Sequence, residues 1–117
     1  MSADKQTPAV KRARERIASI RDALGAMDYV CSGTLARRMM KCGQPSCRCK
    51  TDPAARHGPY YLWGHMKGGK LVNRMIAPEK VPALRQAIAN YRKAKKLLLA
   101  WEAETERLID SGALSLD

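Results

Sequence analysis

The chain has 117 residues, a formal net charge of +11 and no phenylalanine. This length suits one small domain with a thin apolar core, so a metal ion or a partner subunit is expected to add stability. No run of residues is apolar enough to span a membrane, and the polar, basic first sixteen residues are unlike a secretory signal. We therefore expect a cytoplasmic protein without a membrane segment, whose cysteines stay reduced.

Positive charge is concentrated before the last fifth of the chain. Residues 1–96 hold 21 Lys and Arg against 6 Asp and Glu, whereas residues 97–117 hold one basic and five acidic side chains. A body this basic attracts polyanions, of which nucleic acid is the commonest in a cell. The alternative is a basic protein that has no such partner.

Residues 1–25 are expected to form a disordered lead-in, 1–6, and then a basic helix. Thr7 and Pro8 are residue types of an N-cap and a first helical position, and Gly25 is a helix stop. Apolar residues recur on one face at Val10, Ala13, Ile17, Ile20 and Leu24. The opposite face carries Lys11, Arg12, Arg14, Arg16 and Arg21, which could contact phosphates or simply solvent.

The helical period is lost after Met27. Residues 34–40 could form a strand or a short helix, and we favour a strand that leads into the cysteine-rich segment. On a strand, Arg37 and Arg38 project to opposite faces, so only one of them is expected to reach a given ligand.

Four potential metal ligands follow, Cys42, Cys47, Cys49 and His57, at the spacing C-x4-C-x-C-x7-H. Three thiolates and one imidazole are a closed tetrahedral zinc set, typical of a structural site with no open position for catalysis. The basic neighbours Lys41, Arg48 and Lys50 would lower the thiol pKa values and offset the negative charge of such a site.

Other readings of these residues stay open. The cysteines could be ordinary reduced thiols, or could have a redox or disulfide role. Cys31 could replace His57 as the fourth ligand, although a small buried residue is the role that we favour for it. His65 is a lone histidine on a predicted strand, and we leave it outside the site.

A β-hairpin is predicted next, with strands at about 60–66 and 71–76. The turn between them contains Gly68 and Gly69, as a tight hairpin turn requires. Strand alternation places Tyr61 and Trp63 on the face opposite Tyr60, so one aromatic set can pack inward while the other stays available. A hairpin beside a zinc knuckle resembles a zinc ribbon in layout.

A long helix is predicted from Pro78 to Asp110. Its apolar stripe comprises Val81, Leu84, Ile88, Tyr91, Leu98, Trp101, Thr105 and Leu108. A helix of roughly 32 residues would extend about 48 Å, too far for a small domain to cover without a second helix beside it. Acidic residues at its end oppose the helix dipole, so a basic element should lie there. The N-terminal helix packed antiparallel is one candidate, and the same helix of a second subunit is the other.

Several motifs resemble those of a known family. They are Gly33-Thr34-Leu35, Cys-Gly-x-Pro-x-Cys-x-Cys from Cys42, His-Gly-Pro-Tyr-Tyr from His57, Gly69-Lys70, and an Ile-x-x-x-x-Val stretch that leads into the basic helix. Over roughly residues 30–100 the chain is similar to DUF6788, a family of short uncharacterised proteins from bacteria, archaea and phages that are common beside mobile elements. This resemblance implies no settled activity.

The elements together predict an α+β fold. A small zinc-ribbon-like β-hairpin and knuckle, 26–77, is flanked by the N-terminal helix of 1–25 and a long C-terminal helix, 78–111, and these helices form a coiled-coil-like pair. Residues 112–117 are a tail. We expect homodimers and a bound Zn²⁺.

The predicted function is non-enzymatic nucleic-acid binding, with DNA favoured over RNA. Aromatic side chains would stack on bases while cations hold phosphates. The expected contacts are Arg37, Arg38, Lys41, Arg48, Lys50, Tyr61, Trp63, Lys67, Lys70 and Arg74. The mobile-element setting of the resembled family adds support for DNA, as a regulator or as an accessory factor of a mobile element or phage.

Two other function classes are a protein adaptor and an enzyme. A protein adaptor would use the zinc hairpin and the long helix to bind a larger protein partner. An enzyme is disfavoured because the acidic residues of the basic part are few and isolated, and no Ser/His/Asp set or carboxylate pair stands out.

Overall fold

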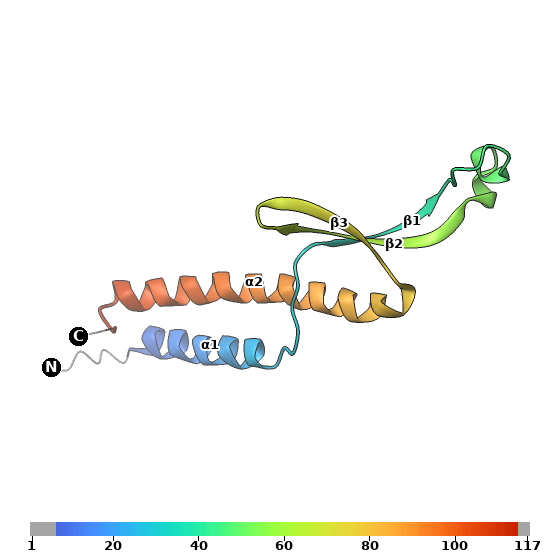
Figure 1. Ribbon diagram of the computed structural model, residues 1–117. Helices are drawn as coiled ribbons and strands as arrows, with labels where there is room; N and C mark the ends of the chain where they lie inside the picture. Colours follow the sequence, from blue (N-terminus) through green and yellow to red (C-terminus); the bar gives the residue numbers. More distant parts are fainter. Residues whose placement is uncertain (1–6, 115–117) are drawn as a thin grey trace. The chain divides into compact units, whose positions relative to one another are not determined.

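The computed structural model describes residues 7–114, and its fold is α+β as predicted. Helix α1 (Pro8–Gly25) precedes a three-stranded antiparallel sheet, and the long helix α2 (Val81–Asp110) follows it (Figure 1). The predicted lead-in of residues 1–6 and the last three residues of the predicted tail lie outside the described part. Within residues 7–114, no helix is both long enough and apolar enough to cross a membrane.

The described residues form two compact units. The helical unit consists of α1 with the chain up to Tyr29 and the chain from Asn90 onward. The sheet unit is Val30–Ala89, which includes the first turns of α2.

The helical unit is an antiparallel helix pair. Helix α1 begins as predicted, because the Thr7 hydroxyl accepts a hydrogen bond from the Val10 backbone N–H at 3.1 Å. The Asn90 side-chain amide donates to the Tyr29 carbonyl at 2.9 Å, and Arg14 donates to the Ala113 carbonyl at 3.2 Å. These contacts join opposite ends of the two helices, which lie side by side in Figure 1. The core of this unit comprises Val10, Ala13, Leu108 and Ala113, with Ile17 and Leu114 packed against it.

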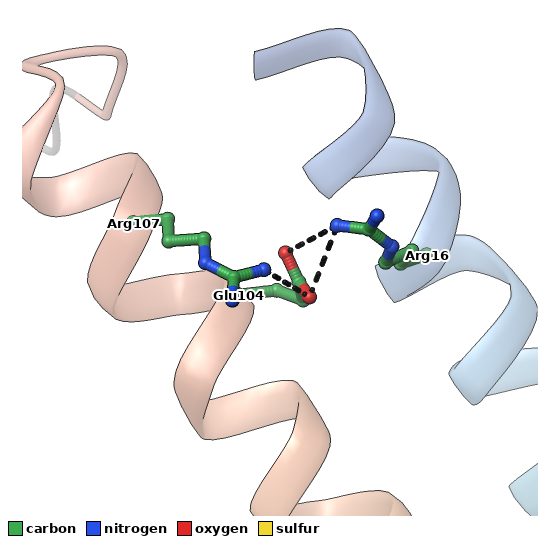
Figure 2. A network of polar contacts seen from close by, with 3 residues as sticks. All are labelled: Arg16, Glu104 and Arg107. Atoms are coloured by element: carbon green, nitrogen blue, oxygen red, sulfur yellow. Dashed lines mark hydrogen bonds and ion pairs between the residues drawn. The ribbon is translucent and has the colours of Figure 1, made fainter. Parts of the chain in front are cut away.

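One acidic residue of α2 is buried in this pair. Glu104 is only 6% exposed, and its carboxylate accepts hydrogen bonds from Arg16 of α1 at 3.4 Å and from Arg107 at 2.8 Å (Figure 2). The expectation that a basic helix lies beside the acidic end of α2 is therefore confirmed. The two guanidinium groups oppose the like-charge field that acid creates at a helix C-terminus.

The predicted apolar stripe of α2 is correct at its ends and wrong at one residue. Val81, Ile88 and Leu108 are buried as expected, but Leu98 is 48% exposed. Leu97 is half-buried in its place. Within the helical unit, the covered positions Ala94, Leu97, Trp101, Glu104 and Leu108 are three or four residues apart, as expected for one face of a helix.

The sheet unit has the strand order β1-β2-β3, with β1 at Thr34–Met40, β2 at His57–Lys67 and β3 at Lys70–Ile76. The strand preference for residues 34–40 and the predicted hairpin are both confirmed. Gly68 and Gly69 of the turn have φ of 60° and 80°, a region that side chains disfavour.

Two further glycines in the family-like motifs lie where the backbone passes close to a neighbouring strand. Gly33 has φ 119° and Gly58 has φ 133°. A Cβ on Gly33 would lie 2.3 Å from the Gly64 carbonyl oxygen, and a Cβ on Gly58 would lie 2.9 Å from the Arg38 carbonyl oxygen. Only glycine fits these backbone approaches.

The strand register assigns side chains to the two faces of the sheet. Arg37 lies opposite Tyr61, and Trp63 lies opposite Arg74, so these four residues share one face. The other face carries the pairs Leu62–Met75 and Met66–Leu71. Met66, Leu71 and Met75 are 59%, 65% and 57% exposed, respectively.

Candidate metal centre

The cysteine-rich segment closes one end of the sheet, between β1 and β2 (Figure 1). Cys42 lies two residues after Met40, the last residue of β1, and His57 is the first residue of β2. Cys47 is the N-cap of the short 3-10 helix η1 (Arg48–Lys50), which contains Cys49. A shift of register between Arg38 and Met40 accompanies the pairing of Met40 with His57. Adjacent antiparallel strands thus bring residues 42 and 57 to the same end of the sheet.

The four predicted ligands come together in space. One ligand atom from each of Cys42, Cys47, Cys49 and His57 lies within 4.8 Å of all the others. The Cys49 and Cys42 sulfur atoms are 3.5 Å apart, and the Cys47 sulfur is 3.3 Å from His57 Nε2. In a tetrahedral zinc site, bond lengths of about 2.3 Å to sulfur and about 2.0 Å to nitrogen place ligand atoms roughly 3.5–3.8 Å apart. The observed separations therefore suit a single ion of this size.

Hydrogen bonds pre-arrange the buried sulfur of this group. Cys49 is fully buried, and its Sγ accepts a hydrogen bond from the Cys42 backbone N–H at 3.2 Å. This N–H is the main cause that lowers the pKa of Cys49. The Cys49 backbone hydrogen bond lowers the pKa of Cys47, but the contacts with the Cys49 and Cys42 side chains and desolvation raise it overall. Three thiols this close compete for negative charge, because each thiolate disfavours the next.

A divalent cation would remove that competition. Thiolates and imidazole are soft or borderline ligands, and three of the first with one of the second are a known structural zinc set. The donor types and the separations both fit Zn²⁺, so Cys42, Cys47, Cys49 and His57 could bind a metal ion. The ion would supply a rigid crosslink between the end of β1 and the start of β2.

Cys31 is not part of this group. It is half-buried, burial raises the pKa of its thiol, and its backbone N–H donates to the Ala87 carbonyl at 3.2 Å. The fourth member of the group is therefore His57 of β2 and not Cys31.

Asp52 supports the loop that carries the candidate ligands, a role that the sequence pattern did not indicate. Its side chain accepts a hydrogen bond from the Ala54 backbone N–H at 3.0 Å, which caps the 3-10 helix η2 (Pro53–Ala55). The same carboxylate pairs with Arg48 at 3.1 Å. The Asp-Pro dipeptide was a usable signal, because aspartate before proline is a common helix start.

The predicted nucleic-acid contacts fall into three places. Six of them lie on one sheet face or at its turn by register: Arg37, Tyr61, Trp63, Lys67, Lys70 and Arg74. Arg38 belongs to the opposite face, as strand alternation required. Lys41, Arg48 and Lys50 are exposed around the cysteine group.

Trp63 already has partners within the sheet. Its ring stacks on His65 with centroids 3.9 Å apart, the Arg74 guanidinium lies 5.8 Å from its centroid, and its indole N–H donates to the Ser32 carbonyl at 2.9 Å. His65 is thus a packing partner of Trp63, and its buried Nδ1 has no hydrogen-bond partner among residues 7–114. Base stacking by Trp63 stays a prediction, and a base would have to share or displace these contacts.

A family model, that of a domain of unknown function (DUF6788), matches residues 8–86, which is more than half of the chain. The chain belongs to this family, as the motifs around Cys42 and His57 indicated. The match includes α1, the whole sheet and all four candidate ligands. No curated protein and no solved structure gives a significant match.

Proposed function

We propose that this DUF6788 protein is a zinc-stabilised, non-enzymatic nucleic-acid-binding protein, with DNA favoured over RNA. The observation that supports it most is the charge of the sheet and the cysteine-rich segment. Residues 34–76 hold nine Lys and Arg but only one acidic residue, Asp52. Asp52 is itself paired with Arg48. A surface with so little acidic charge favours a polyanionic partner.

The metal has a structural role in this proposal. Three thiolates and one imidazole leave no open coordination position, so the site offers no place for a substrate. Holding the ends of β1 and β2 together would keep Lys41, Arg48 and Lys50 beside the strand that carries Arg37 and Arg38. The proposal places recognition on this fixed cationic surface.

The sheet face with Arg37 and Arg74 is the expected contact surface. Each of these arginines has an aromatic neighbour directly across the strands, Tyr61 and Trp63 respectively. Cations beside aromatic rings suit single-stranded or distorted nucleic acid, where phosphates and base faces are both accessible. The role in a cell that we propose is that of a regulator or accessory factor of a mobile element or phage.

Salt-dependent binding tests this function. Fluorescence anisotropy with labelled random-sequence duplex and single-stranded DNA, repeated at several salt concentrations, should give a steep linear fall of log K with log salt. The double substitution Lys67→Glu and Lys70→Glu at the exposed hairpin turn should weaken binding and reduce the salt slope by about two, since each lost phosphate contact removes about one. RNA of the same sequence is the competitor that separates DNA from RNA preference.

The double substitution Lys93→Glu and Lys96→Glu is the matched control. It changes the net charge equally, but both lysines are exposed on α2, outside the sheet and the cysteine-rich segment. Equal loss of affinity in both variants would mean that only overall charge matters. Absence of a salt-dependent interaction in the wild-type protein would end the proposal.

A protein adaptor is the second candidate function, and the sheet face opposite Arg37 and Arg74 favours it. Met66, Leu71 and Met75 are more than half exposed there, and the pair Met66–Leu71 is separated from the pair Leu62–Met75 only by Gly64 and Asn73. Exposed methionines adapt to apolar partner surfaces. If Leu71→Lys abolishes capture of a protein partner while random-DNA binding is absent in the wild type, the adaptor function replaces the first proposal.

A further inference from the structure

The helical unit has a groove that the helix pair leaves uncovered. Helix α2 lines it with a stripe at helical spacing, Leu98, Trp101, Glu102, Thr105, Glu106 and Ile109. Helix α1 borders the adjoining hollow with Arg14, Ile17, Ala18 and Arg21, and this hollow also contains Trp101 and Thr105. Because Trp101 and Thr105 line both the groove and the adjoining hollow, the groove and the hollow form one continuous face across the two helices. All the residues that line this face belong to the helical unit.

The groove contains large apolar side chains that are exposed to water, which is energetically unfavourable. Leu98 is 48% exposed and Ile109 is 61% exposed. They stand at the two ends of the α2 stripe, with Trp101 half-buried between them. An exposed stripe of this kind on a helix is typical of a surface that packs against another helix.

The groove is divided by charge along its two helices. Its α2 side has the carboxylates Glu102 and Glu106, and its α1 side has the guanidinium groups of Arg14 and Arg21. Within residues 7–114, neither glutamate is in an ion pair. Arg14 donates one N–H to the Ala113 carbonyl, and a guanidinium has further donors available. Because one side of the face is acidic and the other is basic, the face is electrostatically complementary to the same face of a second copy.

We propose that this groove is the interface of a homodimer, in which α1 of each subunit lies over α2 of the other to form a four-helix bundle. This inference does not depend on nucleic-acid binding. A two-fold axis parallel to the helices gives this arrangement, because it places the basic α1 of one copy over the acidic stripe on α2 of the other copy. An axis perpendicular to the helices would instead place glutamates opposite glutamates.

The levels of the charged residues fit this arrangement. The Arg16–Glu104 ion pair sets position 16 of α1 level with position 104 of α2. Because the helices are antiparallel, Arg14 is level with about position 106, and Arg21 lies within about one turn, roughly 5.4 Å, of Glu102. A two-fold axis parallel to the helices keeps these levels. Each subunit thus presents Arg14 near Glu106 of the other copy, and Arg21 near its Glu102.

Charge reversal with mixing tests the proposal in the full chain. Sedimentation equilibrium of the wild type should show a dimer. The variants Glu102→Arg/Glu106→Arg and Arg14→Glu/Arg21→Glu should each weaken self-association by about 100-fold or more, since like charges then face each other. Mixing the two variants should restore a dimer, because each basic stripe then meets an acidic one. Circular dichroism checks that each variant is folded.

Asp110→Arg is the control for the α2 side. It makes the same charge change as Glu106→Arg, one turn later on α2 and outside the groove, so it should leave the dimer intact. A wild type that stays monomeric at the highest concentration reached would overturn the proposal. So would a dimer that survives both double reversals, and so would a mixture that stays monomeric although both variants are folded.

Discussion

Gly58→Ala is expected to damage the metal centre from a position that is not a ligand. Gly58 is the second residue of β2 and lies between the pairs Met40–His57 and Arg38–Tyr60, at φ 133°, where an L side chain is strained. A Cβ there would also lie 2.9 Å from the Arg38 carbonyl oxygen and 3.1 Å from the Tyr60 backbone nitrogen. Both are backbone atoms, so neither can move away without disturbing the β1–β2 ladder.

The cost follows from these two terms. A side chain in a sparsely populated backbone region costs about 1–3 kcal/mol, and a forced contact costs a similar ~1–3 kcal/mol. Alanine also reduces the entropy of the unfolded chain and returns about 0.4–1 kcal/mol. The net loss should be about 2–4 kcal/mol, which for a unit of this size lowers the midpoint of thermal unfolding by roughly 10 °C or more.

The assay compares two glycines of the same motif region. Gly43 follows Cys42 directly, but a Cβ there would meet no atom within 4 Å and its φ is not positive. Gly43→Ala should therefore leave both thermal unfolding and bound zinc per chain unchanged, measured by elemental analysis on protein purified without chelators. Gly58→Ala should lower both. Equal behaviour of the two variants would refute the reasoning that backbone geometry at Gly58 sets the position of His57.

Two further substitutions test the metal group and the helix pair. Cys49→Ser removes a fully buried sulfur and should abolish the binding of one zinc ion per chain. Cys31→Ser changes a cysteine outside the group and should leave zinc binding intact. Zinc bound by the Cys49→Ser variant would contradict the assigned ligand set. Glu104→Ala removes the carboxylate that two arginines share and should cost about 1–2 kcal/mol in urea unfolding, less than a fully buried pair because both arginine side chains are more than half exposed. Glu15→Ala, on the exposed side of α1, is the control, and its free energy of unfolding should stay within about 0.5 kcal/mol of the wild-type value. If Glu104→Ala and Glu15→Ala change the free energy of unfolding equally, the Glu104 contacts contribute nothing.

Local chemistry was sufficient for the elements and for the candidate ligands. Thr7-Pro8 defines where α1 starts because an N-cap hydroxyl and a proline act within one turn. The paired glycines define the hairpin turn because its backbone angles exclude side chains. Cys42, Cys47 and Cys49 are predictable as one group because residues that are few positions apart can always approach, and the paired strands then bring His57 to them.

Other features depend on packing between segments that are distant in the sequence. The sequence pattern indicates a surface acid at position 104, but in the fold Arg16 of α1 pairs with Glu104. The pattern also places Leu98 in the apolar stripe, but in the fold Leu98 is exposed and Leu97 is half-buried. Strand alternation separates Arg37 from Arg38, but only the register across β1, β2 and β3 shows that Arg37 shares a face with Tyr61, Trp63 and Arg74. The sequence determines which side chains each local segment can present. The tertiary structure decides which of them meet, because burial and pairing are properties of two surfaces and not of one.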